Sequence, residues 1–175
     1  MPITPDTKDW TWVLTRPCPE CGFDATTVEL TEVGGIVRAN AGIWAEVLER
    51  DNVGERPDAN TWSPLEYACH VRDVHSLFAE RLVLAMTHQN PVFPDWNQDE
   101  AAVEGRYADQ APGQVASDVM DAAFAAAEAF DGVPAESAGR TGRRSDGAQF
   151  TIETLGRYYV HDIVHHAWDV TNGID

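Results

Sequence analysis

Tyr-Tyr-Val-His-Asp-Ile-Val-His-His-Ala-Trp, residues 158–168, holds three of the six histidines of the chain. If this segment is helical, His161 and His165 lie one above the other, because residues four apart on an α-helix are surface neighbours. Two imidazoles at this spacing supply half of a metal shell, and a catalytic site needs one more protein ligand and an open position. The segment therefore predicts a helix that carries a metal site.

Four segments have the apolar periodicity of an amphipathic helix. Their lengths suit a small helical bundle, and most are bounded by residues that stop helices, such as glycine and proline. The connection 90–110 contains two prolines and several acidic residues, and a connection of this length is expected to cross a bundle or to cover a site. The helices are expected at 31–50, 64–87, 111–130 and 152–169.

The second helix has the clearest beginning. Ser63 is a good N-cap, Pro64 occupies a position where its missing N–H costs nothing, and Glu66 completes a capping box. His70 falls on the apolar face of this helix and is expected to point inward. His75 lies off that face and is expected at the surface. A single inward histidine is more often a hydrogen-bonded core residue. The histidine pair on another apolar helix instead favours a metal site that both helices share.

A bundle brings side chains from separate helices together at its core, so His70, His161 and His165 can converge. Imidazole accepts Zn²⁺, Ni²⁺, Cu²⁺ and Fe²⁺, and the residues do not choose among them. Asp162 and Glu66 are candidates for orienting an imidazole or moving a proton, although capping is the preferred role of Glu66. The neighbouring His166 is expected either to contact the ligands without binding the metal or to lie at the surface.

Two other clusters are candidates for chemistry. Cys18 and Cys21 have the spacing of a zinc knuckle or a redox pair, in an extended arm with a tight turn. The only other thiol is the isolated Cys69, so a four-cysteine site within one chain is excluded. Three interpretations of this pair stay open. In the first, the two thiols simply lie in a turn, reduced or incidentally paired; in the second, they bind metal or take part in thiol chemistry near the active site; in the third, they form a redox sensor. Arg143 and Arg144 lie in a solvated turn or form an anion-binding lip for a carboxylate or thiolate substrate.

Composition excludes several classes of protein. At 175 residues the chain suits one domain. Twenty-nine acidic residues against twelve Lys plus Arg give a formal charge of −17, which would repel nucleic acid and anionic membranes. The sequence has no apolar run long enough to cross a membrane and no secretory signal, so we expect a cytoplasmic protein.

Two patterns resemble the DinB-like superfamily of metal-binding four-helix bundles. They are Trp62-Ser-Pro-x-Glu-x-x-x-His70 at the start of the second helix and His161-x-x-x-His165 on the last. The resemblance spans roughly residues 31–169. Three further patterns resemble one actinobacterial branch of this family: Trp-Val-Leu-x-Arg-Pro-Cys-Pro-Glu-Cys-Gly-Phe-Asp at 12–24, Arg-Arg-Ser-Asp-Gly at 143–147 and His-Asp-x-Val-His-His at 161–166.

The resemblance implies an all-α, up-up-down-down four-helix bundle, often homodimeric. We expect a single domain over 1–175, with a non-helical arm at 1–30 and the bundle at 31–170. The resemblance also implies a divalent metal, zinc or nickel, on His70, His161 and His165. Relatives include mycothiol-dependent maleylpyruvate isomerase and bacillithiol or mycothiol S-transferases, so a metal-dependent thiol transferase or hydrolase acting on a small molecule is expected. A low-molecular-weight thiol is the expected co-substrate.

Two other functions compete with this one. His161-Asp-x-x-His165 has the outline of a zincin helix, but the aspartate is shorter than the usual glutamate and would lie farther from the water that it must activate. A non-enzymatic bundle, in which the metal or the polar cluster only stabilises a protein that binds a ligand or partner, is the alternative. Bound metal and turnover distinguish the three.

Overall fold

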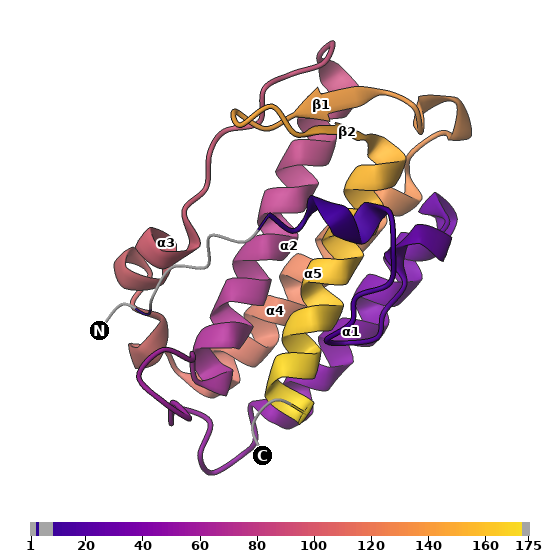
Figure 1. Cartoon of the computed structure of the whole chain (residues 1–175). Coiled ribbons are helices and arrows are strands. Elements are labelled where there is room, and N and C mark those ends of the chain that lie inside the picture. The colour runs from indigo at the N-terminus through magenta and orange to yellow at the C-terminus, as the bar shows by residue number, and fades with distance from the viewer. Residues whose placement is uncertain (1–2, 4–8, 173–175) are drawn as a thin grey trace.

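Four long helices lie side by side in the computed structural model, which describes Ile3 and residues 9–172 (Figure 1). A short helix precedes α4, and a two-stranded antiparallel hairpin leads into α5. The predicted all-α four-helix bundle is confirmed. None of the described helices is long and apolar enough to cross a membrane. The elements are α1 (Val33–Val47), α2 (Pro64–Thr87), α3 (Gln98–Glu104), α4 (Pro112–Asp131), β1 (Thr141–Arg143), β2 (Gln149–Thr151) and α5 (Ile152–Asn172).

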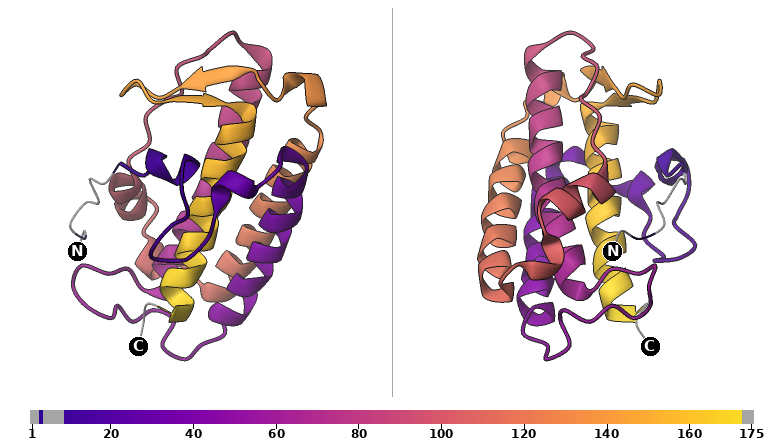
Figure 2. Two further views of the ribbon diagram at one scale, coloured as in Figure 1. Left: turned by 45° about the vertical axis from the view of Figure 1, so that its right-hand side comes forward. Right: turned by 90° about the vertical axis from the view of Figure 1, so that its left-hand side faces the viewer.

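The N-terminal arm crosses the outer face of α5 (Figures 1 and 2). It is not wholly non-helical as predicted, because it contains 3₁₀ turns at Thr11–Leu14, Ala25–Thr27 and Leu30–Glu32. The guanidinium of Arg157 on α5 donates to the carbonyl of Val28 at 2.9 Å. The arm is therefore attached to the helix that carries the histidine cluster.

The helix directions differ from the expected order. Arg140 donates to the carbonyl of Ala85 near the end of α2, and its own carbonyl accepts from the N–H of Ile152, so α5 begins where α2 ends. Arg50, just after α1, donates to the carbonyl of Val170, so α1 and α5 end together. These contacts make α2 antiparallel to α5 and α1 parallel to it.

The ion pair between Arg38 and Asp131, 2.7 Å apart, joins the first half of α1 to the end of α4 and makes those two helices antiparallel. The order is therefore up, down, down, up, and the expected up-up-down-down order is wrong. The reason lies in the connections. The segment 48–63 reverses the chain after α1, whereas the segment 88–111 runs back along the bundle, as its length predicted, so α4 starts at the end where α2 began (Figure 2).

The start of α2 matches the prediction in detail. The Ser63 hydroxyl accepts from the N–H of Glu66, and the Glu66 carboxylate accepts from the N–H of Ser63, which is a complete capping box. Arg56 also pairs with Glu66. Burial raises the pKa of Glu66, but the hydrogen bonds from Arg56 and Ser63 outweigh it, and the pKa is lowered. Glu66 is therefore held as an ionised capping residue.

Aromatic rings fill the space between the four helices. The ring of Tyr159 stacks on Phe78 from α2, with ring centres 4.9 Å apart, and on Phe130 from α4, 5.4 Å apart. On α1, the Trp44 indole donates to Asn40, whose amide donates to the carbonyl of Ile163 on α5. The core therefore connects α5 to all three of its partner helices.

His75 was predicted at the surface, and this is wrong. Its side chain is fully buried, and its Nδ1 hydrogen-bonds the hydroxyl of Tyr159 at 2.6 Å. Burial lowers the pKa of His75 to about 4. The helical wheel failed here because α2 lies between α4 and α5 and is covered on more than one face.

His75 should make the fold sensitive to acid. An unfolded histidine, with a pKa near 6.5, binds a proton that the buried ring excludes, so the free energy of unfolding falls as the pH drops from 6.5 toward 4. We expect the free energy of unfolding of His75→Asn, whose amide can still hydrogen-bond Tyr159, to fall by about 2 kcal/mol less than that of the wild type between pH 7 and pH 5. Urea unfolding at both pH values measures this. His88→Asn, at an exposed position, is the control, and equal losses in all three proteins would contradict the assignment.

Candidate metal centres

Helix α5 contributes to two separate groups of metal-binding side chains. One consists of His70, Asp162 and His166, and the other of Cys18, Cys21, His161 and His165. In each group the potential ligand atoms all lie within 4.8 Å of one another. Because successive residues are turned by about 100° around a helix, α5 directs Asp162 and His166 toward α2 and directs His161 and His165 toward the arm.

The group of His70, Asp162 and His166 has the dimensions of a metal shell. The Nε2 atoms of His70 and His166 are 3.1 Å apart. Asp162 Oδ1 lies 3.4 Å from His166 Nε2 and 3.9 Å from His70 Nε2. Ligands at about 2.0–2.1 Å from a tetrahedral ion would be separated by about 3.4 Å. Among the described residues, the buried Asp162 Oδ1 has no hydrogen-bond partner, so these atoms fit a bound cation.

The surroundings of this group hold the imidazoles in their metal-binding form. Burial lowers the pKa of His70, which favours the neutral ring that a metal requires. Burial raises the pKa of Asp162, but the neighbouring imidazoles of His70 and His166 lower it below its ordinary value. The Nδ1 of His166 lies 3.0 Å from Asp169 Oδ2, so that carboxylate can accept the Nδ1 proton and leave the Nε2 lone pair facing the site.

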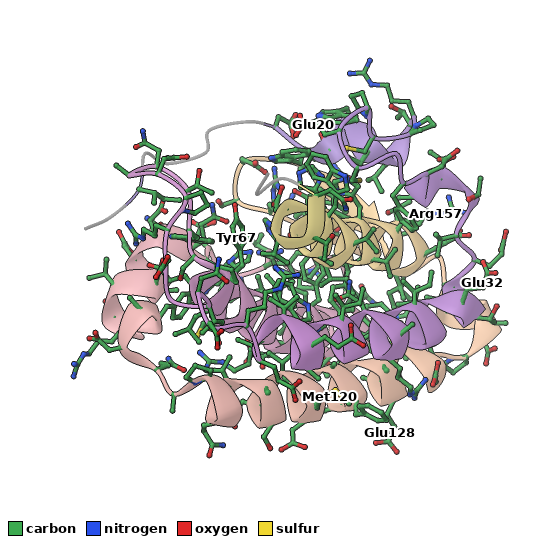
Figure 3. All side chains as sticks on the ribbon, turned by 90° about the horizontal axis from the view of Figure 1, so that it is seen from below. Glu20, Glu32, Tyr67, Met120, Glu128 and Arg157 are labelled. Carbon is green, nitrogen blue, oxygen red and sulfur yellow. The ribbon has the colours of Figure 1, made fainter. Side chains whose placement is uncertain are left out.

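Aromatic residues enclose the same group. Trp96, from the long connection before α3, stacks on His70 with ring centres 5.4 Å apart, and Trp62 lies 5.1 Å from that ring. Tyr67 lies between α2 and α5, with its ring centre 5.4 Å from that of His166 (Figure 3). The rings therefore shield His70, which is buried, whereas Asp162 and His166 are partly exposed.

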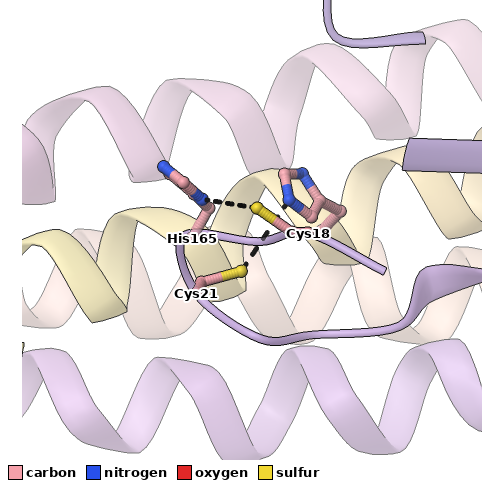
Figure 4. Close-up of side chains that lie close together, drawn as sticks. Cys18, Cys21 and His165 are labelled. Atoms are coloured by element: carbon pink, nitrogen blue, oxygen red, sulfur yellow. Dashed lines mark hydrogen bonds between the residues drawn. The ribbon is translucent and has the colours of Figure 1, made fainter. Parts of the chain in front are cut away.

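The second group joins the arm to α5. Cys18 Sγ lies 3.7 Å from His165 Nδ1, and Cys21 Sγ lies 3.9 Å from His161 Nε2 (Figure 4). Both cysteines are free thiols in the structure. Burial raises the pKa of Cys21 to about 11 and lowers that of His161 to about 4. Two thiol sulfurs and two imidazole nitrogens, the donor atoms of many structural zinc sites, thus lie within 4.8 Å of one another.

The structure divides the predicted triad of histidines. His70 lies with Asp162 and His166, whereas His161 and His165 lie with the two cysteines. Glu66, the other predicted acid, belongs to neither group. Ligation by any of these residues stays a prediction. Sequence reasoning missed His166, although Asp162-x-x-x-His166 has the same four-residue spacing as His161-x-x-x-His165 and was the signal that could have identified it.

The two predicted anion-binding arginines differ in position. Arg143 is exposed on β1, whereas Arg144 is half-buried, pairs with Asp146 and donates to the hydroxyl of Tyr158 at 3.3 Å. Burial and the nearby Asp162 carboxylate raise the pKa of Tyr158, which stands one turn before Asp162 on α5. Through Tyr158, Arg144 therefore lies on the side of α5 that carries Asp162. The exposed Arg143 does not make the contacts that Arg144 makes with Tyr158 and Asp146.

Arg81 is a further cation on this side that sequence reasoning missed. It is half-buried on α2 between the rings of Phe78 and Phe93, and its Nε is buried with no hydrogen-bond partner among the described residues. Desolvation lowers its pKa, while Tyr158 and Asp162 act in the opposite direction. Its position eleven residues after His70 places both on one helical face, a periodicity that was readable from the sequence.

Comparison with known proteins agrees with this architecture. Residues 36–170 match the family model of the DinB superfamily. A solved structure with the same arrangement of helices is YfiT from Bacillus subtilis, described as a probable metal-dependent hydrolase with an unusual four-helix bundle topology. It has a TM-score of 0.68 and 14% identity, and the match covers 99% of this chain and 94% of YfiT. No curated protein matches the chain. At this identity the likeness to YfiT shows the fold alone.

Proposed function

The chain belongs to the DinB superfamily, and from that premise we propose that it is a metal-dependent enzyme acting on a small molecule. We place the reaction centre at His70, Asp162 and His166, in place of the predicted triad with His161 and His165. The supporting observation is the convergence of three ligand atoms from two helices, 3.1 to 3.9 Å apart. Metal dependence is also what is described for YfiT, the structural relative.

Two imidazoles and one carboxylate leave coordination positions open for a substrate. This donor set accepts zinc, nickel or ferrous iron. A divalent ion there would act as a Lewis acid and lower the pKa of a water or thiol that binds it. Asp169 fixes the tautomer of His166, while Trp62 and Trp96 keep bulk water from His70.

The substrate is proposed to carry a negative charge. The molecule as a whole has a formal charge of −17, yet Arg144 and Arg81 lie half-buried on the side of Tyr158 and Asp162. A partly desolvated guanidinium binds carboxylates and phosphates more strongly than an exposed one. These arginines would hold an anionic group while the reacting bond lies near Asp162. Arg143, being exposed, has no part in this proposal.

Water and a low-molecular-weight thiol are both possible nucleophiles, which gives a hydrolase or an S-transferase. Catalysis of either kind should depend on bound metal. We expect the protein to lose turnover of small anionic esters, amides or electrophiles after treatment with a chelator, and to recover it when Zn²⁺ or Ni²⁺ is restored. Parallel assays with and without mycothiol separate the reactions, since only a transferase consumes free thiol.

Elemental analysis of the same samples completes the test. Metal that is bound stoichiometrically without turnover of any substrate class would contradict the enzymatic proposal and favour a bundle that only binds a ligand. A cytoplasmic homodimer without a nucleic-acid partner stays a prediction.

A further inference from the structure

We propose that Cys18, Cys21, His161 and His165 form a second, closed zinc site that fastens the N-terminal arm to α5. The site is separate from the proposed reaction centre and does not depend on the proposed function. Its ligands come from two segments about 140 residues apart, so a bound ion would act as a crosslink between them.

The turn that carries the cysteines is already shaped for metal binding. The N–H of Gly22 donates to the carbonyl of Cys18, and the N–H of Cys18 donates to the carbonyl of Phe23, which brings both thiols to one side. Gly22 has a φ of +74°, a conformation that glycine adopts readily and other residues rarely do. The glycine after the second cysteine is therefore required by this turn.

The distances fit a tetrahedral ion. With Zn–S bonds of about 2.3 Å and Zn–N bonds of about 2.0–2.1 Å, a sulfur and a nitrogen of one tetrahedron lie about 3.5 Å apart. The two Cys–His separations are 3.7 and 3.9 Å, and no pair of the four atoms exceeds 4.8 Å. A small contraction around an ion would complete the shell. Four protein ligands leave no position for a substrate, which is typical of a structural zinc site.

Neighbouring groups support the histidines as ligands. His165 Nε2, opposite the nitrogen that faces Cys18, lies 3.6 Å from Glu20 Oε2 and 3.7 Å from Asp169 Oδ1, where a carboxylate can orient the ring. Glu20 lies on the arm above α5 (Figure 3). The ring of Trp10 covers His165 at 4.9 Å and His161 at 5.7 Å between ring centres. Cys18, His161 and His165 are all buried.

Asp169 contacts both groups, since its Oδ1 faces His165 and its Oδ2 faces His166. The two sites therefore share an orienting carboxylate but no ligand. Variants can separate them, because the loss of one set of ligands leaves the other complete.

Cobalt substitution of the full-length, reduced protein tests the proposal. Tetrahedral Co²⁺ bound by thiolates has a strong sulfur-to-metal charge-transfer absorption, which a site of histidine and carboxylate lacks. We expect the wild type to bind two equivalents of Co²⁺ and to show this absorption. The double variant Cys18→Ser/Cys21→Ser should bind one equivalent without it, and His166→Ala should bind one equivalent and retain it. Cys69→Ser, which removes the third thiol, is the matched control and should behave as the wild type.

Hydrogen exchange reports the crosslink directly. Removing metal from His166→Ala, which keeps only this site, should speed exchange of the Cys18 and Gly22 amides at least about 10-fold and leave the centre of α2 unchanged, since local openings are independent of the core. Absorption that persists in the folded double variant would overturn the proposal. If that variant does not fold, the spectrum of the wild type is the test. A folded wild-type protein without thiolate-to-cobalt absorption would overturn the second site. This result does not depend on the enzyme assays.

Discussion

Replacing His70 by alanine is expected to remove the metal from the group of His70, Asp162 and His166 and to lower kcat/KM by at least about 10³-fold. His70 supplies the only ligand from α2, so its loss leaves two donors from α5. A bound ion contributes several kcal/mol to transition-state stabilisation, and each 1.36 kcal/mol corresponds to about tenfold in rate. Elemental analysis and steady-state kinetics on the purified variant measure the two effects together.

His161→Ala is the matched comparison, because the sequence assigned His161 to the same metal as His70. In the structure His161 belongs to the cysteine group. We therefore expect His161→Ala to keep the metal bound at His70 and to retain most of the activity when it folds. Equal losses of metal and activity in His70→Ala and His161→Ala would support the predicted triad of His70, His161 and His165 and contradict the proposed reaction centre.

Replacing Trp44 by alanine is expected to lower the free energy of unfolding by about 4–5 kcal/mol. The indole is fully buried on α1, and truncation of such a ring leaves a cavity that the surrounding helices cannot close. It also deprives Asn40 of the indole donor, and Asn40 is the residue that hydrogen-bonds the backbone of α5 at Ile163. The thermal midpoint should fall by roughly 10–20 °C.

Ile43→Ala is the control for this effect. Ile43 is the preceding residue on the same helix and is 38% exposed, so its truncation should change stability by no more than about 0.5 kcal/mol. Urea unfolding of the three proteins at pH 7 gives the comparison. A Trp44→Ala variant as stable as Ile43→Ala would show that the contact between α1 and α5 contributes little to the fold.

The positions of the helices followed from local chemistry. The capping box of Ser63 and Glu66 and the proline at the first helical position fixed the start of α2, and the observed helix begins at Pro64. Apolar periodicity located the other three long helices within a few residues. The hairpin of β1 and β2 was not predicted, because three-residue strands carry almost no periodic signal.

Local spacing along the chain was enough to predict a four-helix bundle with potential metal ligands clustered on the last helix. Both predictions, the helices and the cluster of ligands, depend on the spacing of residues within one segment, and helix propensity and apolar periodicity can be read from such a segment directly. Which histidines lie together depends instead on packing between segments far apart in the chain. His161 and His165, and Asp162 and His166, are equally spaced pairs turned by about 100° from each other, so the choice of partner rests on what packs against each face. The arm covers one face and α2 the other, and no pattern within residues 158–168 encodes the position of either.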